Sequence, residues 1–243
     1  MTGVKNLQNS LARSQEAQRR HNRPETFRLN GREWDLIPGV FSPVSSPTTR
    51  HSLQLLGILE PDVQPLFGSL LEVGCGSGVV AVSAALAGCS RVVASDINEA
   101  AVLNTEQNAV RHGVHDRLHA LRSDVFDGIA ENDRFDVVFW HSNYVLAPPN
   151  YQYRNMHERA YADPGYRTHR RFLEQAPGRL TAGGSAFLHF STRGDLSRLL
   201  REAADCRRSL SLVASATGLE GGQEIEHLLL EISVAPDRAR CTL

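Results

Sequence analysis

Apolar and polar positions along the chain form blocks that predict strands and helices in alternation. From residue 70 onward, short apolar runs of strand length are each followed by a longer segment with helical spacing of its apolar residues. Strands that alternate with helices in this way predict a parallel sheet covered by helices on both faces. We therefore expect an α/β protein with a doubly wound sheet. Its strands are expected at 70–73, 91–95, 118–121 and 135–140, with helices at 79–87 and 98–112.

The C-terminal part continues the alternation and then changes it. Two apolar runs, 210–214 and 225–232, follow each other without a helical segment between them, so we expect them to pair as closing strands. The elements before them are expected to be a helix at 168–180, a turn at Gly183-Gly184, a strand at 186–190 and a helix at 196–204.

The segment before residue 47 has a different pattern. Its first part is polar, with only Leu7 and Leu11 at helical spacing, which predicts a weakly amphipathic helix or a solvated tail. Asn30-Gly31 lies between two short runs and predicts a β-hairpin. We therefore divide the chain into an N-terminal extension of residues 1–46, a lid candidate made of a helix and a hairpin, and a main domain of residues 47–243.

Composition and charge narrow the class of protein. The net charge is −1 and the acids and bases are interspersed, so nothing indicates long-range attraction to a phosphate backbone. We expect a small-molecule or peptide partner and no nucleic acid. The four cysteines have no paired spacing, which indicates a reducing compartment and neither a disulfide framework nor a metal site. No apolar run is long enough to span a bilayer, so a cytoplasmic protein without a membrane segment is expected.

The richest candidate chemistry follows the first strand of the main domain. Gly74, Gly76 and Gly78 form a turn in which backbone can approach a ligand closely, because glycine tolerates a positive φ and has no Cβ. Asp96 ends the next strand, roughly 20 residues further on, where an acid can accept the hydroxyl protons of a ribose. The spacing differs from the Gly-x-Gly-x-x-Gly that dinucleotide pyrophosphates need. The sequence therefore predicts a nucleoside ligand without a pyrophosphate.

These residues resemble the first motif of the class I S-adenosylmethionine-dependent methyltransferases, which have a Rossmann-like sheet ending in an inserted antiparallel strand. The motif, acid-x-Gly-x-Gly-x-Gly, corresponds here to Glu72 through Gly78 and includes Cys75. The resemblance implies that S-adenosylmethionine is the cofactor and that the main domain is the catalytic domain. It further implies that Asp96 holds the ribose, that Ile97 packs on the adenine, and that Asp124 and Val125 contact the adenine edge.

A second resemblance lies where the fourth strand ends, at the edge where crevices open in parallel sheets. Asn143-Tyr144 resembles, imperfectly, the Asn-Pro-Pro-Tyr motif of the branch that methylates amide or amino nitrogens, such as the glutamine methyltransferases of release factors. The two prolines are missing, so the rigid turn of that motif is not reproduced. We expect Asn143 to contact the substrate or the methionine part of the cofactor, Tyr144 to stack on a flat group or the sulfonium, and His141 to act as a base.

The segment 41–49 resembles the part of the same branch that precedes the cofactor domain, which implies that Phe41 and Thr48 border the cofactor. Three functions remain open. The first is a methyltransferase acting on nitrogen or oxygen of a small molecule or peptide side chain. The second is a cyclase that converts S-adenosylmethionine itself into azetidine-2-carboxylate and methylthioadenosine. The third is a non-catalytic subunit that binds S-adenosylmethionine.

Overall fold

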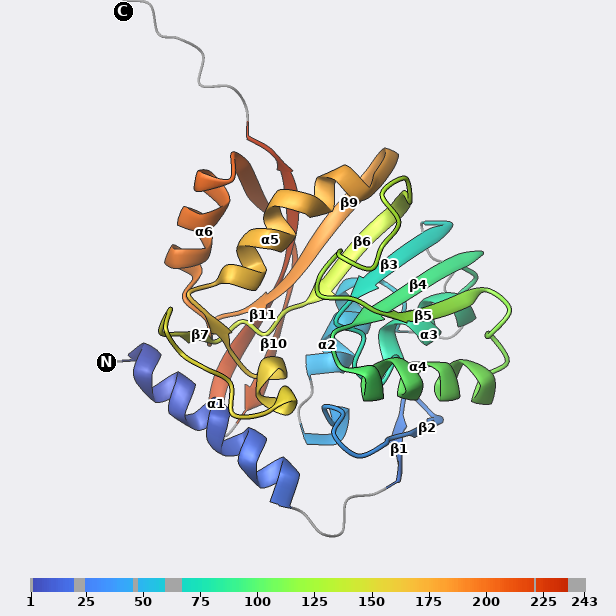
Figure 1. The fold of residues 1–243 in the computed structure, drawn as a ribbon, viewed down its shortest axis with the longest axis horizontal. Helices are drawn as coiled ribbons and strands as arrows, with labels where there is room; N and C mark the ends of the chain where they lie inside the picture. The colour runs from blue at the N-terminus through green and yellow to red at the C-terminus, as the bar shows by residue number, and fades with distance from the viewer. Residues whose placement is uncertain (1, 20–24, 46–47, 60–66, 221, 236–243) are drawn as a thin grey trace, which may run out of the picture.

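Seven strands form one twisted sheet at the centre of the molecule (Figure 1). The computed structural model describes residues 2–19, 25–45, 48–59, 67–220 and 222–235. The strand order is β10-β11-β9-β6-β3-β4-β5, with β11 antiparallel to both of its neighbours and the other pairings parallel. The strands are β3 (Ser69–Val73), β4 (Arg91–Asp96), β5 (Leu118–Arg122), β6 (Phe135–His141), β9 (Leu180–Ser191), β10 (Arg208–Glu220) and β11 (Gln223–Val234). The Rossmann-like sheet with an inserted C-terminal strand is confirmed.

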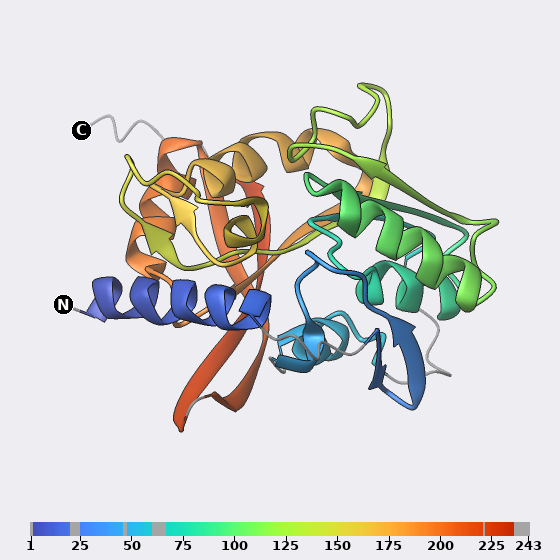
Figure 2. The same ribbon diagram turned by 60° about the horizontal axis from the view of Figure 1, so that its bottom comes forward.

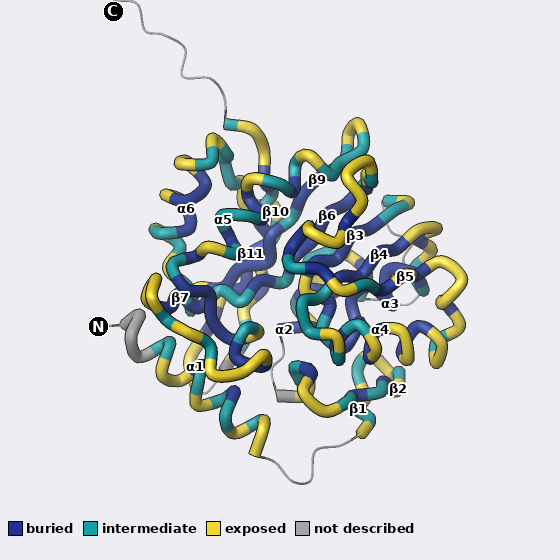
Figure 3. Tube along the Cα trace, viewed as in Figure 1, coloured by how far each residue is buried: buried dark blue, intermediate teal, exposed yellow. Residues whose placement is uncertain are grey.

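Helices cover both faces of this sheet and bury a separate apolar core on each. One core packs α2 (Thr48–Leu55), α3 (Val79–Leu86) and α4 (Glu99–Arg111) against the sheet. The opposite core contains residues of α5 (Arg167–Gln175) and α6 (Leu196–Asp205). The central strands β3, β4 and β6 are almost entirely buried, whereas the outer strand β10 is largely exposed (Figure 3). Apolar strand runs of this kind are what two covered faces require.

The N-terminal segment adds a hairpin and a helix. The hairpin pairs β1 (Thr26–Leu29) with β2 (Arg32–Asp35), and both turn residues, Asn30 and Gly31, have positive φ as expected for this tight turn. The helix α1 (Thr2–Arg19) forms in full and lies beside the segment that follows β6 (Figures 1 and 2). The boundary expected between residues 46 and 47 falls outside the described residues.

Two expectations about the C-terminal part are wrong in detail. Gly183-Gly184 does not turn the chain, because β9 passes through it with an irregularity in its pairing to β6. A Cβ at Gly184 would meet the carbonyl oxygens of Phe135 and Asp136, so the strands approach too closely there for a side chain. The closing strands are also longer than expected, and β10 carries a bulge at Val213.

Two connecting strands complete the part of the fold that matters for the site. The segment between β6 and α5 contains β7 (Leu146–Ala147), the short helix η2 (Met156–Ala160) and β8 (Asp163–Pro164). Since β7 and β8 pair with each other, residues 148–162 form a closed insertion above the sheet. Within the described residues, no helix is both long and apolar enough to cross a membrane.

Candidate active site

A cavity of about 360 Å³ lies at the carboxyl ends of β3, β4 and β6. The chain runs from β3 to β4 and β5 on one side and returns to place β6 on the other side of β3. Ligands of open α/β sheets bind at this reversal, because the loops after the strands diverge there and leave a crevice. The cavity volume lies in the range of small-molecule sites.

The glycine turn forms the floor of this cavity. Gly74 and Gly76 line it and both have positive φ. A Cβ at Gly76 would have no atom within 4 Å, so it would project into open space. Gly78 is not among the lining residues. A Cβ there would lie 2.8 Å from the Thr105 hydroxyl, so glycine at this position lets α3 start against α4.

The acid at the end of β4 is held by backbone amides. Asp96 Oδ2 accepts from the N–H of Gly76 at 3.0 Å, and Oδ1 accepts from the N–H of Asn98 at 2.9 Å. Burial raises the pKa of Asp96, whereas these amide donors lower it. Ile97 follows and also lines the cavity. The carboxylate keeps acceptor capacity toward the cavity, as ribose binding would require.

Glu72 and Cys75 are the other two motif residues with titratable groups. The Glu72 carboxylate is buried and accepts from the N–H of Ala81 at 2.8 Å. Burial raises its pKa well above the ordinary value, and the nearby Asp96 charge acts in the same direction. Burial likewise raises the pKa of the Cys75 thiol, which excludes a reactive thiolate at neutral pH. Both residues line the cavity as structural neighbours of the turn.

The loop after β5 supplies one wall. Asp124 and Val125 line the cavity, and Val125 has a positive φ of 57°. The Asp124 carboxylate pairs with Arg171 of α5 at 2.7 Å, and the Asp124 carbonyl accepts from the same guanidinium at 3.0 Å. One carboxylate oxygen is therefore engaged by protein, and the arginine fixes the loop against α5.

Asn143 presents an acceptor in a fixed orientation. Its amide Nδ2 donates to the carbonyls of Arg159 at 2.8 Å and Ala162 at 2.9 Å, which uses both hydrogens. Its Oδ1 is buried, and no described residue gives it a hydrogen-bond partner. Since the carbonyls can only accept, the amide cannot be turned around without losing both bonds. A buried acceptor without a protein partner, in a residue of the cavity wall, can be satisfied by a bound water or by a ligand that donates to it.

His141 and Tyr144 flank this asparagine in the cavity wall and reach a group of buried histidines. The His141 ring stacks on His189 with centroids 4.3 Å apart. His189 Nε2 lies 3.0 Å from His227 Nδ1, and its Nδ1 lies 2.7 Å from the hydroxyl of Ser52. Burial lowers the pKa of His189 well below its ordinary value, and the other histidines add to this. Among the described residues no group of side chains has the geometry of a metal site.

The N-terminal segment forms the roof. Phe41 and Thr48 line the cavity as the sequence predicts, and the Phe41 ring packs on Tyr161 of the insertion. A helix was expected in the N-terminal extension as part of a lid candidate, but none of its residues was assigned to the site; α1 contributes Ser10 and Arg13 to the same cavity. Its polar residues at intervals of four contact the rest of the chain: Asn6 donates to the Arg193 carbonyl, Ser10 to the Tyr161 carbonyl, Ser14 bonds with His157, and Gln18 with Asn155. That spacing is the signal that could have identified the buried face, because these side chains lie on one side of a helix.

Comparison with known proteins identifies the family of this fold and site. The family model of ribosomal protein L11 methyltransferase matches residues 38–158. A release factor glutamine methyltransferase of Bordetella pertussis is 30% identical over 226 residues, which cover 83% of this chain and 79% of that protein. A ribosomal protein L11 methyltransferase of Acinetobacter baumannii is 38% identical over 104 residues, but the match covers 42% of this chain and 33% of the relative.

Solved structures agree on the fold. An L11 methylase of Lactobacillus delbrueckii has a TM-score of 0.54 at 16% identity, over 81% of this chain and 82% of that chain. A T. thermophilus 16S rRNA methyltransferase in complex with AdoMet and guanosine has a TM-score of 0.55 at 24% identity, over 86% of this chain and 50% of that chain.

These relatives correct the expectation about partners. We expected a small-molecule or peptide partner and no nucleic acid. That restriction is wrong, because the relatives are named for a release factor, a ribosomal protein and a ribosomal RNA. The net charge near zero is an average over the whole surface. This average does not give the charge of the few residues that face a substrate.

Proposed function

This chain belongs to the class I S-adenosylmethionine-dependent methyltransferases, the family of the release factor glutamine methyltransferases, and we propose that its methyl acceptor is a carboxamide nitrogen of a protein side chain. The chain is an enzyme, so the alternative of a non-catalytic subunit is set aside. Its cofactor is S-adenosylmethionine, which supplies a methyl group on a positively charged sulfur.

The observation that carries the proposal is the unpartnered Oδ1 of Asn143. A carboxamide nitrogen is a poor nucleophile because its lone pair is delocalised into the carbonyl group. When the N–H donates to a fixed oxygen, the electron density at the nitrogen atom increases. The same oxygen stabilises the positive charge that develops on the nitrogen during methylation. In the reaction the N–C bond forms, the S–C bond breaks and one N–H proton leaves. The protein must otherwise orient the nitrogen and exclude water.

We assign the cofactor end of the cavity to the glycine turn and Asp96. The open space above Gly76 admits a ligand against the backbone, and Asp96 has a carboxylate ready for two hydroxyls. Asp124, Val125 and Ile97 are proposed to border the adenine. His141 also lines the cavity, and we propose it as the group that receives the released proton.

A protein substrate is favoured over RNA by the extent of similarity. The release factor methyltransferase matches most of both chains at 30% identity, whereas the ribosomal RNA enzyme is similar in fold alone. A carboxamide on a side chain also reaches a recessed acceptor such as Asn143 without the backbone entering the cavity.

The test uses S-adenosylmethionine with a labelled methyl group, offered with bacterial protein extract and, separately, with total RNA. We expect label in protein that is released by acid hydrolysis as methylamine, the product of an N-methylated carboxamide. Asn143→Ala is expected to lower the initial rate about 100-fold while S-adenosylhomocysteine still binds. Asn150→Ala, an exposed asparagine of the insertion, is the matched control.

Three results would overturn the proposal. Label that nuclease removes and protease leaves would identify RNA as the acceptor. Methylthioadenosine formed without any acceptor would identify the cyclase. An unchanged rate in Asn143→Ala would remove the residue on which the proposal rests.

A further inference from the structure

The Asn143-Tyr144 loop lacks the two prolines that stiffen this turn in Asn-Pro-Pro-Tyr. Without proline, the backbone after Asn143 has two free dihedrals per residue, and ordering them costs conformational entropy. Another contact can supply that order and hold the loop that carries Asn143, a residue of the cavity wall. The question rests on the function proposed above, because it concerns how the acceptor oxygen is aimed.

Tyr166 provides that contact. Its hydroxyl donates to the carbonyl of Tyr144 at 2.6 Å and accepts from the N–H of Asp195 at 2.8 Å. Its ring is completely buried and its backbone has a φ of 56°, in the left-handed region that non-glycine residues seldom occupy. Such a conformation persists only where the surroundings determine it. Tyr166 is therefore a fixed point to which the loop is tied.

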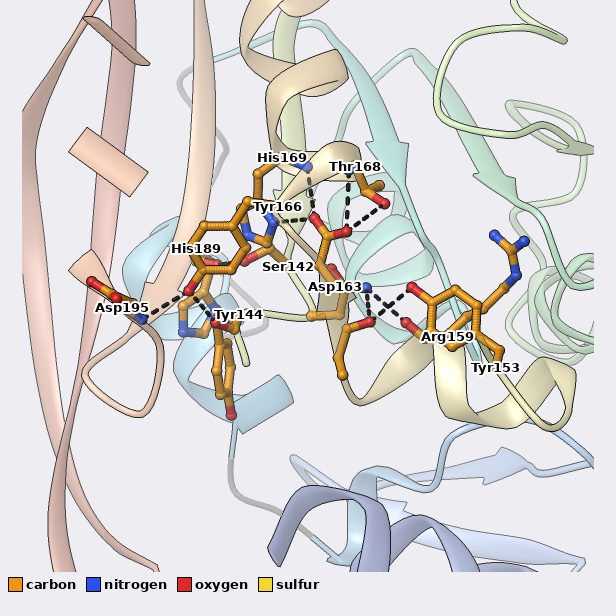
Figure 4. Close-up of polar contacts among 12 residues, drawn as sticks. Ser142, Tyr144, Tyr153, Arg159, Asp163, Tyr166, Thr168, His169, His189 and Asp195 are labelled. Atoms are coloured by element: carbon orange, nitrogen blue, oxygen red, sulfur yellow. Dashed lines mark hydrogen bonds and ion pairs between the residues drawn. The ribbon is translucent and has the colours of Figure 1, made fainter. Parts of the chain in front are cut away.

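A buried acid and histidine hold Tyr166 in turn (Figure 4). The Tyr166 ring packs on His169 with centroids 4.5 Å apart. His169 Nδ1 lies 2.7 Å from Asp163 Oδ2, and both side chains are fully buried. Asp163 also accepts from the N–H and the hydroxyl of Thr168. Both carboxylate oxygens are thus satisfied, which fixes the start of α5 against β8.

The same network reaches Asn143 from its other side. Asp163 directly follows Ala162, whose carbonyl accepts from Asn143 Nδ2 at 2.9 Å and from the Tyr153 hydroxyl at 3.0 Å. The side chain of Asn143 and the carbonyl of the next residue are therefore tied to two neighbouring points of one buried network.

We propose that Tyr166 is a positioning residue for Asn143. Its hydroxyl restrains the loop, as the two prolines do in the related motif. The bond has a second effect. The Tyr144 carbonyl faces Tyr166 and Gly194, neither of which lines the cavity. The Tyr144 carbonyl is engaged by the Tyr166 hydroxyl, whereas Asn143 Oδ1 has no partner among the described residues. The site binds the acceptor nitrogen through a single N–H.

The test is hydrogen exchange of the Asn143 side-chain amide, followed by NMR in protein labelled with ¹⁵N at asparagine. The Asn143 signal is assigned as the one missing in Asn143→Ala. In the wild type we expect slow exchange, because both hydrogens are bonded to buried carbonyls. Tyr166→Phe removes one hydrogen bond from the loop and is expected to accelerate this exchange about tenfold.

Tyr151→Phe is the matched control. It also removes one tyrosine hydroxyl from the same region, but that hydroxyl bonds to Glu158 and not to the Tyr144 carbonyl. Its Asn143 exchange is expected to match the wild type. If Tyr166→Phe lowers the melting temperature yet leaves Asn143 exchange unchanged, the hydroxyl only adds stability and the proposal fails. If Tyr166→Phe does not fold, Thr168→Val is used instead, because it removes one hydrogen bond from Asp163. We expect Thr168→Val to accelerate Asn143 exchange by less than tenfold. An unchanged exchange rate in this variant overturns the proposal.

Exchange needs no acceptor, so it is independent of the proposed function. Once an acceptor is known, Tyr166→Phe is expected to lower kcat and leave KM for S-adenosylmethionine unchanged. In an Asn143→Ala background the same change is expected to have no further effect on the rate. Accelerated exchange without methylation of any carboxamide would support the positioning role and reject the proposed function.

Discussion

Replacing His189 with leucine tests whether the buried histidines make folding stability depend on pH. His189 is fully buried among His141, His227 and His51, and no acid contributes to the shift of its pKa. Burial and these neighbours lower its pKa well below 6.5, so it stays neutral in the folded protein. In the unfolded chain it binds a proton at its ordinary value. The contribution of neutral His189 to the free energy of unfolding is therefore fully present above pH 6.5, and it is lost as the pH falls below that value.

The size of the effect follows from the proton count. One histidine that is neutral when folded and protonated when unfolded costs about 1.4 kcal/mol of stability per pH unit below 6.5. Glu72 acts in the opposite sense, because its raised pKa makes the folded state bind the extra proton. The total pH dependence of the wild type therefore mixes both groups, and only the difference between wild type and variant isolates His189.

The assay is urea unfolding at pH 7.5 and pH 5.5. His189→Leu loses the contacts to Ser52 and His227, so it is expected to be less stable than the wild type at pH 7.5. Between the two pH values it should lose about 1.4 kcal/mol less stability than the wild type. His115→Leu, at an exposed position, is the control for removal of one histidine. Equal losses in wild type and His189→Leu would refute the reasoning.

Two further predictions concern the cofactor side of the cavity. Asp96→Asn keeps the shape but removes the charge, so the Kd for S-adenosylhomocysteine measured by calorimetry should rise about 10- to 100-fold; an unchanged Kd would contradict the ribose assignment. Gly78→Ala should lower the free energy of unfolding by about 1–3 kcal/mol, because its Cβ would meet Thr105 at 2.8 Å. The Cβ in Gly76→Ala would project into open space, so this variant should raise the Kd for S-adenosylhomocysteine more than it lowers the free energy of unfolding. A larger loss of stability in Gly76→Ala together with a larger rise of the Kd in Gly78→Ala would contradict the geometry.

Local sequence signals predicted the elements whose geometry they determine. Asn30-Gly31 specified the hairpin because its turn needs two residues that tolerate positive φ. The glycines after β3 and the acid that ends β4 predicted residues that line the cavity, since each lies at the end of a buried strand. At Gly183-Gly184 the same kind of signal misled. Glycine was needed there for the close approach of two strands, which only the tertiary pairing reveals.

The rest of the site depends on contacts between distant residues. α1 has too few apolar residues for its periodicity to show which face is buried, because it docks through hydrogen bonds to segments roughly 140–190 residues away. The orientation of Asn143 depends on Arg159 and Ala162. The missing prolines correctly marked an altered turn, but the hydroxyl of Tyr166 that compensates lies 22 residues further along the chain. The division of the chain at residue 46 stays a prediction.

The bulge at Val213 changes what the outer edge of the sheet offers for pairing. β10 is an outer strand of the sheet and spans 13 residues, and an edge of that length exposes backbone groups that could pair with the edge of another molecule. Leu212 and Val213 are 59% and 52% exposed, which would favour such a contact. The extra residue interrupts the regular spacing of donors and acceptors and bends the strand. Deletion of Val213 is therefore expected to leave a longer, more regular edge and to increase aggregation, as light scattering would measure.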